Sequence, residues 1–178
     1  MTIRAPNEPK PVKYISAITF SDEVMLAEAI NGLQQELGDC DCETSVFAFE
    51  HSRYYEKEMG PQLSKKFISF QTLDKVDLLV NRKLFAIKLE KKFAVDGKRR
   101  VNIDPAYLEL AKLVVATTKN YDHRIYLGDG IYGDLQLRYR GGKFVANDWT
   151  YPDYRSAIFT HFIEEVRNIY FNQLQQLE

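Results

Sequence analysis

The chain has 178 residues, of which 45% are hydrophobic and 13% are aromatic. This length fits one domain, and this apolar content is enough to build a sizeable core, which excludes an intrinsically disordered chain. Its 24 basic and 25 acidic residues give a net charge of −1, so attraction of the whole molecule to nucleic acid or to a membrane surface is not expected. The apolar runs of the chain, such as residues 78–80, are far too short to cross a bilayer.

The N-terminal half predicts an alternation of strands and helices. Residues 12–20 are rich in β-branched and aromatic side chains, which predicts a strand. Ser21 then stands as a helix cap before apolar residues at helical spacing, and Gly38 ends this helix. The remaining elements are predicted as strands over 43–50 and 67–70, a long helix over 74–95 and a strand over 98–103. The order β-α-β-β-α-β is typical of a ferredoxin-like unit.

The C-terminal half predicts one helix, three strands and a last helix. The pair Asp104-Pro105 is a typical helix start and predicts a helix to about Thr117. An antiparallel three-strand meander is predicted over residues 123–127, 131–140 and 143–146, and a final helix from about Ser156. We therefore expect a single α+β domain over residues 1–178, with 1–11 as an extended, proline-containing lead-in without a signal core. Whether the last strands extend the first sheet or form a second one stays open.

The chain lacks the sequence motifs of several enzyme classes. It has no G-x-x-x-x-G-K-[ST] phosphate loop, no G-x-G-x-x-G after the first strand, no G-x-S-x-G elbow and no H-E-x-x-H zinc motif. Cys40 and Cys42 flank Asp41, a spacing that disfavours a disulfide, and the three histidines are not at zinc-finger spacing. We expect two reduced thiols, no metal site and a cytosolic location.

Charge is unevenly distributed along the chain. Residues 82–100 contain eight basic and two acidic side chains. Two interpretations are open: a solvated helix face with lysines, or an anion-binding surface centred on Lys98, Arg99 and Arg100. Tyr54 and Tyr55 can likewise stack on a planar ligand or cover the core.

Polar residues gather at the predicted ends of the fourth and fifth strands and before the last helix. Arginines recognise phosphate or carboxylate groups, and a histidine oriented by an aspartate can transfer a proton. His123 and Asp129 are the candidate catalytic residues. The other candidate ligand-binding residues, besides the two tyrosines, are Arg100, Asp104, Arg124, Asp153 and Arg155. For Asp153 a cap of the last helix is the alternative, whereas Arg155 near a helix N-terminus opposes the helix dipole and so points to a partner or an anion.

Five longer motifs carry a resemblance to a known family. They are Pro9–Lys13, Tyr54–Gly60, Val95–Pro105, His123–Tyr132 and Trp149–Ser156. Together they resemble a bacterial family described as domain of unknown function number 4416, over nearly the whole chain. Some members are labelled GTP-binding, a label that the missing phosphate loop does not support here. The resemblance implies a bacterial, cytosolic, single-domain protein and carries no activity or cofactor with it.

Three functions remain open. The first is a site that binds, or acts on, a small anionic molecule such as a nucleotide, a phosphate or a carboxylate. The second is a protein-interaction or self-associating module, for which the separated acidic and basic segments argue. The third is an RNA-binding domain, which the ferredoxin-like order allows and the net charge disfavours.

Overall fold

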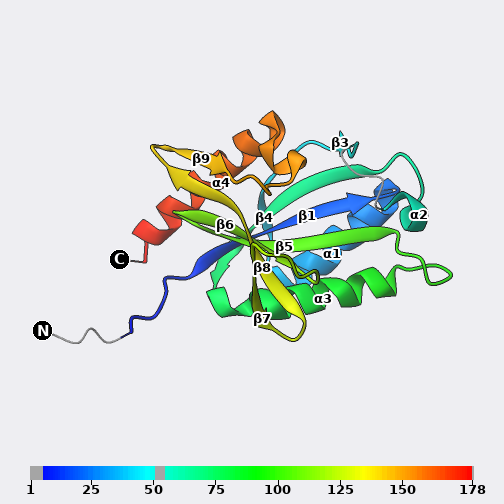
Figure 1. Ribbon diagram of the computed structural model, residues 1–178, viewed down its shortest axis with the longest axis horizontal. Helices are drawn as coiled ribbons and strands as arrows, with labels where there is room; N and C mark the ends of the chain where they lie inside the picture. The colour runs from blue at the N-terminus through cyan, green and yellow to red at the C-terminus, as the bar shows by residue number, and fades with distance from the viewer. Residues whose placement is uncertain (1–5, 51–54, 178) are drawn as a thin grey trace, which may run out of the picture.

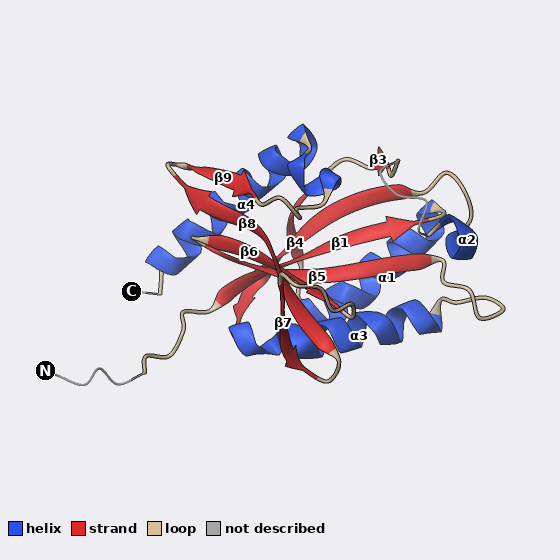
Figure 2. Ribbon diagram, viewed as in Figure 1, coloured by secondary structure: helices blue, strands red, loops and turns tan. Residues whose placement is uncertain are grey.

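The computed structural model describes residues 6–50 and 55–177, which form one twisted antiparallel sheet with helices on both faces (Figures 1 and 2). The main path of the sheet has the order β2-β4-β1-β5-β6-β8-β7, while β3 pairs with β4 and β9 pairs with β8. The strands are β1 (Val12–Phe20), β2 (Cys40–Glu43), β3 (Phe47–Ala48), β4 (Ser64–Asp74), β5 (Val101–Glu109), β6 (Lys112–Thr117), β7 (Arg124–Gly128), β8 (Ile131–Arg140) and β9 (Lys143–Ala146). The helices are α1 (Glu23–Leu37), α2 (Glu56–Met59), α3 (Leu79–Lys92) and α4 (Ala157–Gln175), with 3-10 turns at Val76–Leu78 and Pro152–Arg155.

Strand β1 is the centre of the molecule and is buried along its whole length. Its alternate side chains enter two cores, as the period of a strand requires. Tyr14 and Ile18 pack under α1 and α3, whereas Ile15 and Ala17 pack under α4. The sheet therefore has α1 and α3 on one face and α4 on the other (Figure 2).

The two long amphipathic helices begin at side-chain caps. Asp22 accepts a hydrogen bond from the N–H of Met25 at the start of α1, and Ser156 accepts one from the N–H of Phe159 at the start of α4. The cap of the first helix is thus one residue later than predicted, and Asp153 does not cap the last helix. Predicted strand 12–20 is confirmed, and the last helix is confirmed from Ala157.

The last strands belong to the first sheet. Strand β5 turns back into β6, and β6 pairs with β8, so the C-terminal strands continue the N-terminal sheet. The hairpins predicted across residues 128–130 and 141–142 are both present. The mixed α+β class with an antiparallel sheet is confirmed.

The predicted helix over 104–117 is wrong, because this segment is the hairpin of β5 and β6. Its turn, Leu110-Ala111, lacks the glycine or asparagine that marks most two-residue turns. Hydrogen bonds from distant parts of the chain stabilise this turn. Arg167 Nε donates to the carbonyl of Leu110 at 3.0 Å, and the N–H of Tyr139 donates to the carbonyl of Ala111 at 2.8 Å. Tertiary structure therefore overrides the local helix signal.

Four other predicted boundaries shift. The strand predicted over 98–103 is β5, which begins at Val101 and continues to Glu109. The strand predicted over 43–50 is divided between β2 and the short β3, and the one predicted over 67–70 is the middle of the longer β4. The helix predicted over 74–95 begins as a 3-10 turn and ends at Lys92. Within the described residues, no helix is both long and apolar enough to span a membrane.

Candidate functional site

The sheet opens between β5 and β6. These strands pair only from Ala106–Val115 to Glu109–Lys112, so the first half of β5 has no strand on that side. Helix α3 supplies the missing partners: Glu90 accepts from the N–H of Ile103 at 2.7 Å, and Lys83 donates to its carbonyl at 2.7 Å. Polar side chains of a helix thus replace a strand, and they leave room beside β5.

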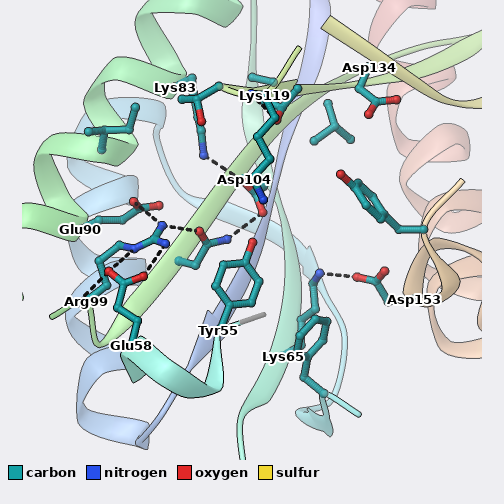
Figure 3. Close-up of a pocket in the computed structure, with 18 of the residues that line it drawn as sticks. Tyr55, Glu58, Lys65, Lys83, Glu90, Arg99, Asp104, Lys119, Asp134 and Asp153 are labelled. Carbon is teal, nitrogen blue, oxygen red and sulfur yellow. Dashed lines mark hydrogen bonds and ion pairs between the residues drawn. The ribbon is translucent and has the colours of Figure 1, made fainter. Parts of the chain in front are cut away.

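A cavity of about 500 Å³ lies at this opening (Figure 3). Its walls come from α3, β4, β5, β6, β8, the α2 segment and the 3-10 turn before α4. Its charged lining consists of five basic and five acidic side chains: Lys65, Lys83, Lys91, Arg99, Lys119, Glu58, Glu90, Asp104, Asp134 and Asp153. Three tyrosines, Tyr55, Tyr151 and Tyr154, complete the polar wall.

Asp104 is the central carboxylate of the cavity. It accepts from Lys83 Nζ and from Asn102 Nδ2, each at 2.8 Å. Burial opposes its ionisation, but the positive charge of Lys83 and these hydrogen bonds outweigh burial, so the pKa of Asp104 lies below its ordinary value. Asp104 is therefore a carboxylate at neutral pH.

Glu90 is shifted in the opposite direction. Its side chain is 4% exposed, and burial raises its pKa above the ordinary value despite the nearby Lys83 and the hydrogen bond from Ile103. Two carboxyl groups with opposite pKa shifts in one cavity are the arrangement that acid–base chemistry uses, and buried structural networks also produce it.

Arg99 and Glu58 close the cavity on the α2 side. The guanidinium donates from Nε and Nη2 to the two oxygens of Glu58 at 2.8 and 2.7 Å, and a further nitrogen lies 3.4 Å from Glu90. The Arg99 side chain holds the pKa of Glu58 below its ordinary value. This two-pronged pair ties α2 to the start of β5.

Lys65 and Asp153 form a buried ion pair on the opposite wall (Figure 3). The ammonium of Lys65 also lies 5.1, 5.2 and 5.5 Å from the ring centres of Phe49, Phe67 and Tyr154. Three rings and one carboxylate leave this cation little capacity for a ligand. Burial raises the pKa of Tyr154 well above its ordinary value, so its hydroxyl stays protonated.

Asp134 and Arg124 form the wall near β7. Arg124 donates from Nε to Asp134 at 2.7 Å and from its terminal nitrogens to the hydroxyl of Tyr151 and the carbonyl of Lys119. Asp134 is 1% exposed and also accepts from Gln136. Arg124 therefore supports the cavity from behind.

The mouth of the cavity carries additional positive charge. Lys91 and Lys119 are exposed, and they line the mouth together with Thr117, the last residue of β6, and Thr118. The side chain of Lys119 points toward Asp104 (Figure 3). All five lining carboxylates contact Lys65, Lys83, Arg99 or Arg124.

Three of the candidate residues line this cavity: Asp104, Asp153 and Tyr55. Arg124 lies directly behind it. Tyr54 lies outside the described residues. The expected convergence of all the polar candidates is therefore only partly present.

Arg100 and Arg155 do not reach the cavity. Arg100 forms an ion pair with Asp22 at the start of α1. Arg155 donates to the backbone carbonyls of residues 147, 148 and 150, so its position before a helix is explained by a loop that it holds and not by an anion.

Neither His123 nor Asp129 lines the cavity. His123 stacks on Trp149 with ring centres 4.9 Å apart and lies 3.5 Å from Asp134. It borders a second, mostly apolar space of about 470 Å³ between α3 and the β7–β8 hairpin. Asp129 is at the tip of that hairpin with a φ of 49°, where it serves the turn.

The sequence interpretation missed most of the network. Lys65, Lys83, Glu90 and Asp134 come from a strand, a helix and another strand, and none lies in a motif with recognisable spacing. A charged residue inside an otherwise apolar pattern was the available signal. Lys83 and Glu90 interrupt the buried face of α3 in this way.

The described residues contain no group of three or more side chains placed to hold a metal ion. The cavity can chemically offer a fixed carboxylate, tyrosine hydroxyls and lysines at its mouth. These groups suit a small polar molecule that carries negative charge.

Comparison with known proteins gives a family and no activity. Neither the curated proteins nor the solved structures contain a significant match to this chain. Residues 10–170 match the family described as Domain of unknown function (DUF4416). Because the match covers most of the chain, as the five motifs predicted, the protein belongs to the DUF4416 family.

Proposed function

We propose that the cavity binds a small anionic ligand, a nucleotide, phosphate or carboxylate, with its charge at the mouth beside Lys91 and Lys119. The observation that carries the proposal is the composition of the mouth, which is lined by Lys91, Thr117, Thr118 and Lys119. The hydroxyls of Thr117 and Thr118 can donate to the same anion.

A thermal-shift experiment tests this proposal. Phosphate, pyrophosphate and a dicarboxylate are titrated at constant ionic strength into the wild type and the Lys91→Met/Lys119→Met variant. A ligand at a hundred times its Kd adds about 2.7 kcal/mol, which raises Tm by several degrees. The matched control is Lys92→Met/Lys98→Met, which removes the same charge from exposed positions outside the cavity.

We expect one of these anions to raise the Tm of the wild type and of the control, and to have no effect on the cavity variant. A Tm that responds to none of them, or that responds equally in both variants, contradicts the proposal.

Self-association is a second candidate function. Strand β7 is the last strand of the sheet order, and its Ile125, Tyr126 and Leu127 are 72%, 60% and 43% exposed. An apolar edge strand is a typical pairing surface. Sedimentation of the wild type and of Ile125→Lys tests this candidate, which requires a larger species that the substitution dissociates.

We further propose a ferredoxin-like arrangement for the N-terminal half, in a single-domain protein located in the cytosol. The order β2-β4-β1-β5, antiparallel throughout, supports the first point. The free thiols of Cys40 and Cys42 support the cytosolic location. Burial raises the pKa values of these thiols to about 11 and 12, so they are not reactive thiolates at neutral pH.

A further inference from the structure

We infer that a second copy of this chain pairs with strand β7, antiparallel and centred on Tyr126, so that one sheet runs through both copies. This inference rests on self-association, the second candidate function, and adds the partner strand and its register. It follows from the open edge of β7 and from the order of the side chains along it.

The outer edge of β7 has no strand beside it within residues 6–50 and 55–177. Strand β7 is the last strand of the sheet order and pairs with β8 on its other edge. The N–H of Arg124 donates to the carbonyl of Tyr121 at 3.1 Å and therefore does not serve β8. Because backbone groups alternate in direction along an antiparallel strand, the N–H and carbonyl of Tyr126 also point away from β8. These two groups are placed to pair with a further strand.

The middle of β7 lacks the features that commonly protect an edge strand, which are lysines, prolines and inward-pointing charges. Residues 125–127 contain no charged side chain and no proline, and their side chains are 72%, 60% and 43% exposed. The preceding charge, that of Arg124, is held by Asp134 at 2.7 Å. A register irregularity between Tyr126 and Gly128 confines regular pairing to the neighbourhood of Tyr126.

The two faces of β7 are complementary to themselves. Ile125 and Leu127 line the apolar space of about 470 Å³ beside α3, whereas Tyr126 lies on the opposite face with its ring centre 5.3 Å from that of Tyr132. In an antiparallel pair centred on Tyr126, this residue lies opposite its own copy, and Ile125 lies opposite Leu127 of the second copy. Apolar side chains therefore meet on one face and tyrosine rings on the other.

Charge agrees with the antiparallel direction. Strand β7 begins directly after His123, and the tip of its hairpin carries Asp129. Antiparallel pairing brings the tip of each copy toward the start of the other strand, so Asp129 approaches His123 of the second copy. A parallel arrangement would place two acidic tips side by side.

A two-fold axis at Tyr126 closes the assembly. Every contact is then made twice, as in the isologous interface of a symmetric dimer. Pairing also covers the edge that each copy exposes, so no edge of β7 remains for a third copy. The expected species is a dimer and not a longer chain of copies.

Disulfide cross-linking tests the register. Tyr126→Cys and Tyr121→Cys are each made in a Cys40→Ala/Cys42→Ala background and oxidised under mild conditions. The two tyrosines are matched in exposure, at 60% and 59%. The Cα atoms of a hydrogen-bonded antiparallel pair are about 5.5 Å apart, which a disulfide can bridge. We expect a covalent dimer for Tyr126→Cys and none for Tyr121→Cys.

Paired charge variants test the same register in solution. Sedimentation is measured for the wild type, Ile125→Lys, Leu127→Glu and Ile125→Lys/Leu127→Glu, each confirmed as folded by circular dichroism. Each single substitution places a charge against an apolar side chain and should raise the Kd of the dimer about tenfold or more. In the double variant the introduced lysine of each copy faces the introduced glutamate of the other, so the dimer should return. Ile158→Lys, at a 40% exposed position of α4, is the matched control and should sediment as the wild type does.

The outcomes separate the inference from the candidate function on which it rests. A dimer that Ile125→Lys dissociates overturns the register and leaves self-association standing if Tyr126→Cys does not cross-link it, if Tyr121→Cys cross-links it equally, or if the double variant stays dissociated. A wild type that sediments as a monomer at every concentration overturns both. If the charged variants do not fold, the comparison of the two cysteine variants decides by itself.

Discussion

Lys65 shows how this protein stabilises a charge inside its sheet. The ammonium pairs with Asp153, and both side chains are almost fully buried, at 7% and 4% exposure. Removing one partner of a buried pair leaves an uncompensated charge, whereas removing both can be nearly neutral. The pair is therefore costly to break and contributes little net stability.

Lys65→Met should destabilise the protein by about 3–5 kcal/mol in urea unfolding, because Asp153 is left buried and unpaired. Lys65→Met/Asp153→Leu should recover most of that loss. Lys92→Met, at an exposed helix position, is the control and should change stability by less than about 0.5 kcal/mol. If Lys65→Met were as stable as the double variant, the buried Asp153 carboxylate would not need the charge of Lys65 for its stabilisation.

Glu90 should make stability depend on pH. Its pKa is raised in the folded protein above the ordinary value of 4.5, so between these two values the folded state holds more protons than the unfolded one. Its contribution to stability therefore decreases as pH rises through this window. Glu90→Gln keeps an oxygen for the N–H of Ile103 and removes the titration.

The measurement is urea unfolding of the wild type and Glu90→Gln at several pH values from 4.5 to 8. The stability of the wild type relative to Glu90→Gln should fall as pH rises. The exposed Glu28→Gln should show no such trend relative to the wild type. A pH-independent difference for Glu90→Gln would mean that Glu90 does not titrate in this range.

For single residues, the sequence indicated which side chains are binding candidates better than it indicated which groups those side chains contact. Asp104 and Asp153 lie in polar motifs that predict binding residues, and both line the cavity. Arg155 has the same kind of context, yet it binds backbone carbonyls. Local sequence does not distinguish a side chain that faces a cavity from one that supports a loop.

Helix α4 packs on the sheet through one face. Phe159, Phe162 and Val166 are buried against β1, β4, β5 and β6, while Phe171 on the same helix is 45% exposed. The ring of Phe159 lies 4.5 Å from that of Phe67 and 4.7 Å from that of Tyr154. Stability therefore depends on this face.

Phe159→Ala should destabilise the protein by about 3–5 kcal/mol, through lost burial and the cavity that remains. Phe171→Ala makes the same chemical change in the same helix at an exposed position and should cost less than about 1 kcal/mol. Chemical denaturation of both variants provides the comparison. Equal losses would show that α4 does not pack through the Phe159 face.

The β5–β6 hairpin is the element that the sequence misassigned, and proline shows why. The backbone N–H and carbonyl of Ile103 face the opening beside β5. Pro105 follows two residues later, so its backbone nitrogen faces the same side of the strand. The missing N–H of Pro105 thus lies where no strand is paired, which a sheet tolerates. The pair Asp104-Pro105 is compatible with the first turn of a helix and also with a strand position that has no hydrogen-bonded neighbour. Only the tertiary contacts decide which of the two structures forms.

Across the whole molecule, one sheet joins the two halves of the chain. Strands from both halves contribute to both cores, and α4 packs on β4 and on β9. The continuation of the sheet beyond β5 was not predictable, because pairing between distant strands leaves no periodic signal in the sequence. We therefore expect the two halves to unfold as one cooperative unit.

Unfolding followed by two probes should therefore give one transition. Trp149 is the single tryptophan and reports on the C-terminal half, while far-ultraviolet circular dichroism reports on all helices and strands. The two midpoints in urea should coincide, as two-state unfolding requires. Two separated transitions would show that the halves unfold independently.

Anion binding at the mouth of the cavity can be followed residue by residue in a phosphate titration monitored by two-dimensional amide NMR. At constant ionic strength we predict saturable shifts that concentrate at Lys91, Thr118 and Lys119. The basic residues outside the cavity, Lys98 and Arg100, should shift little. No shifts, or weak unsaturable shifts spread over all lysine-bearing surfaces, would contradict a defined site.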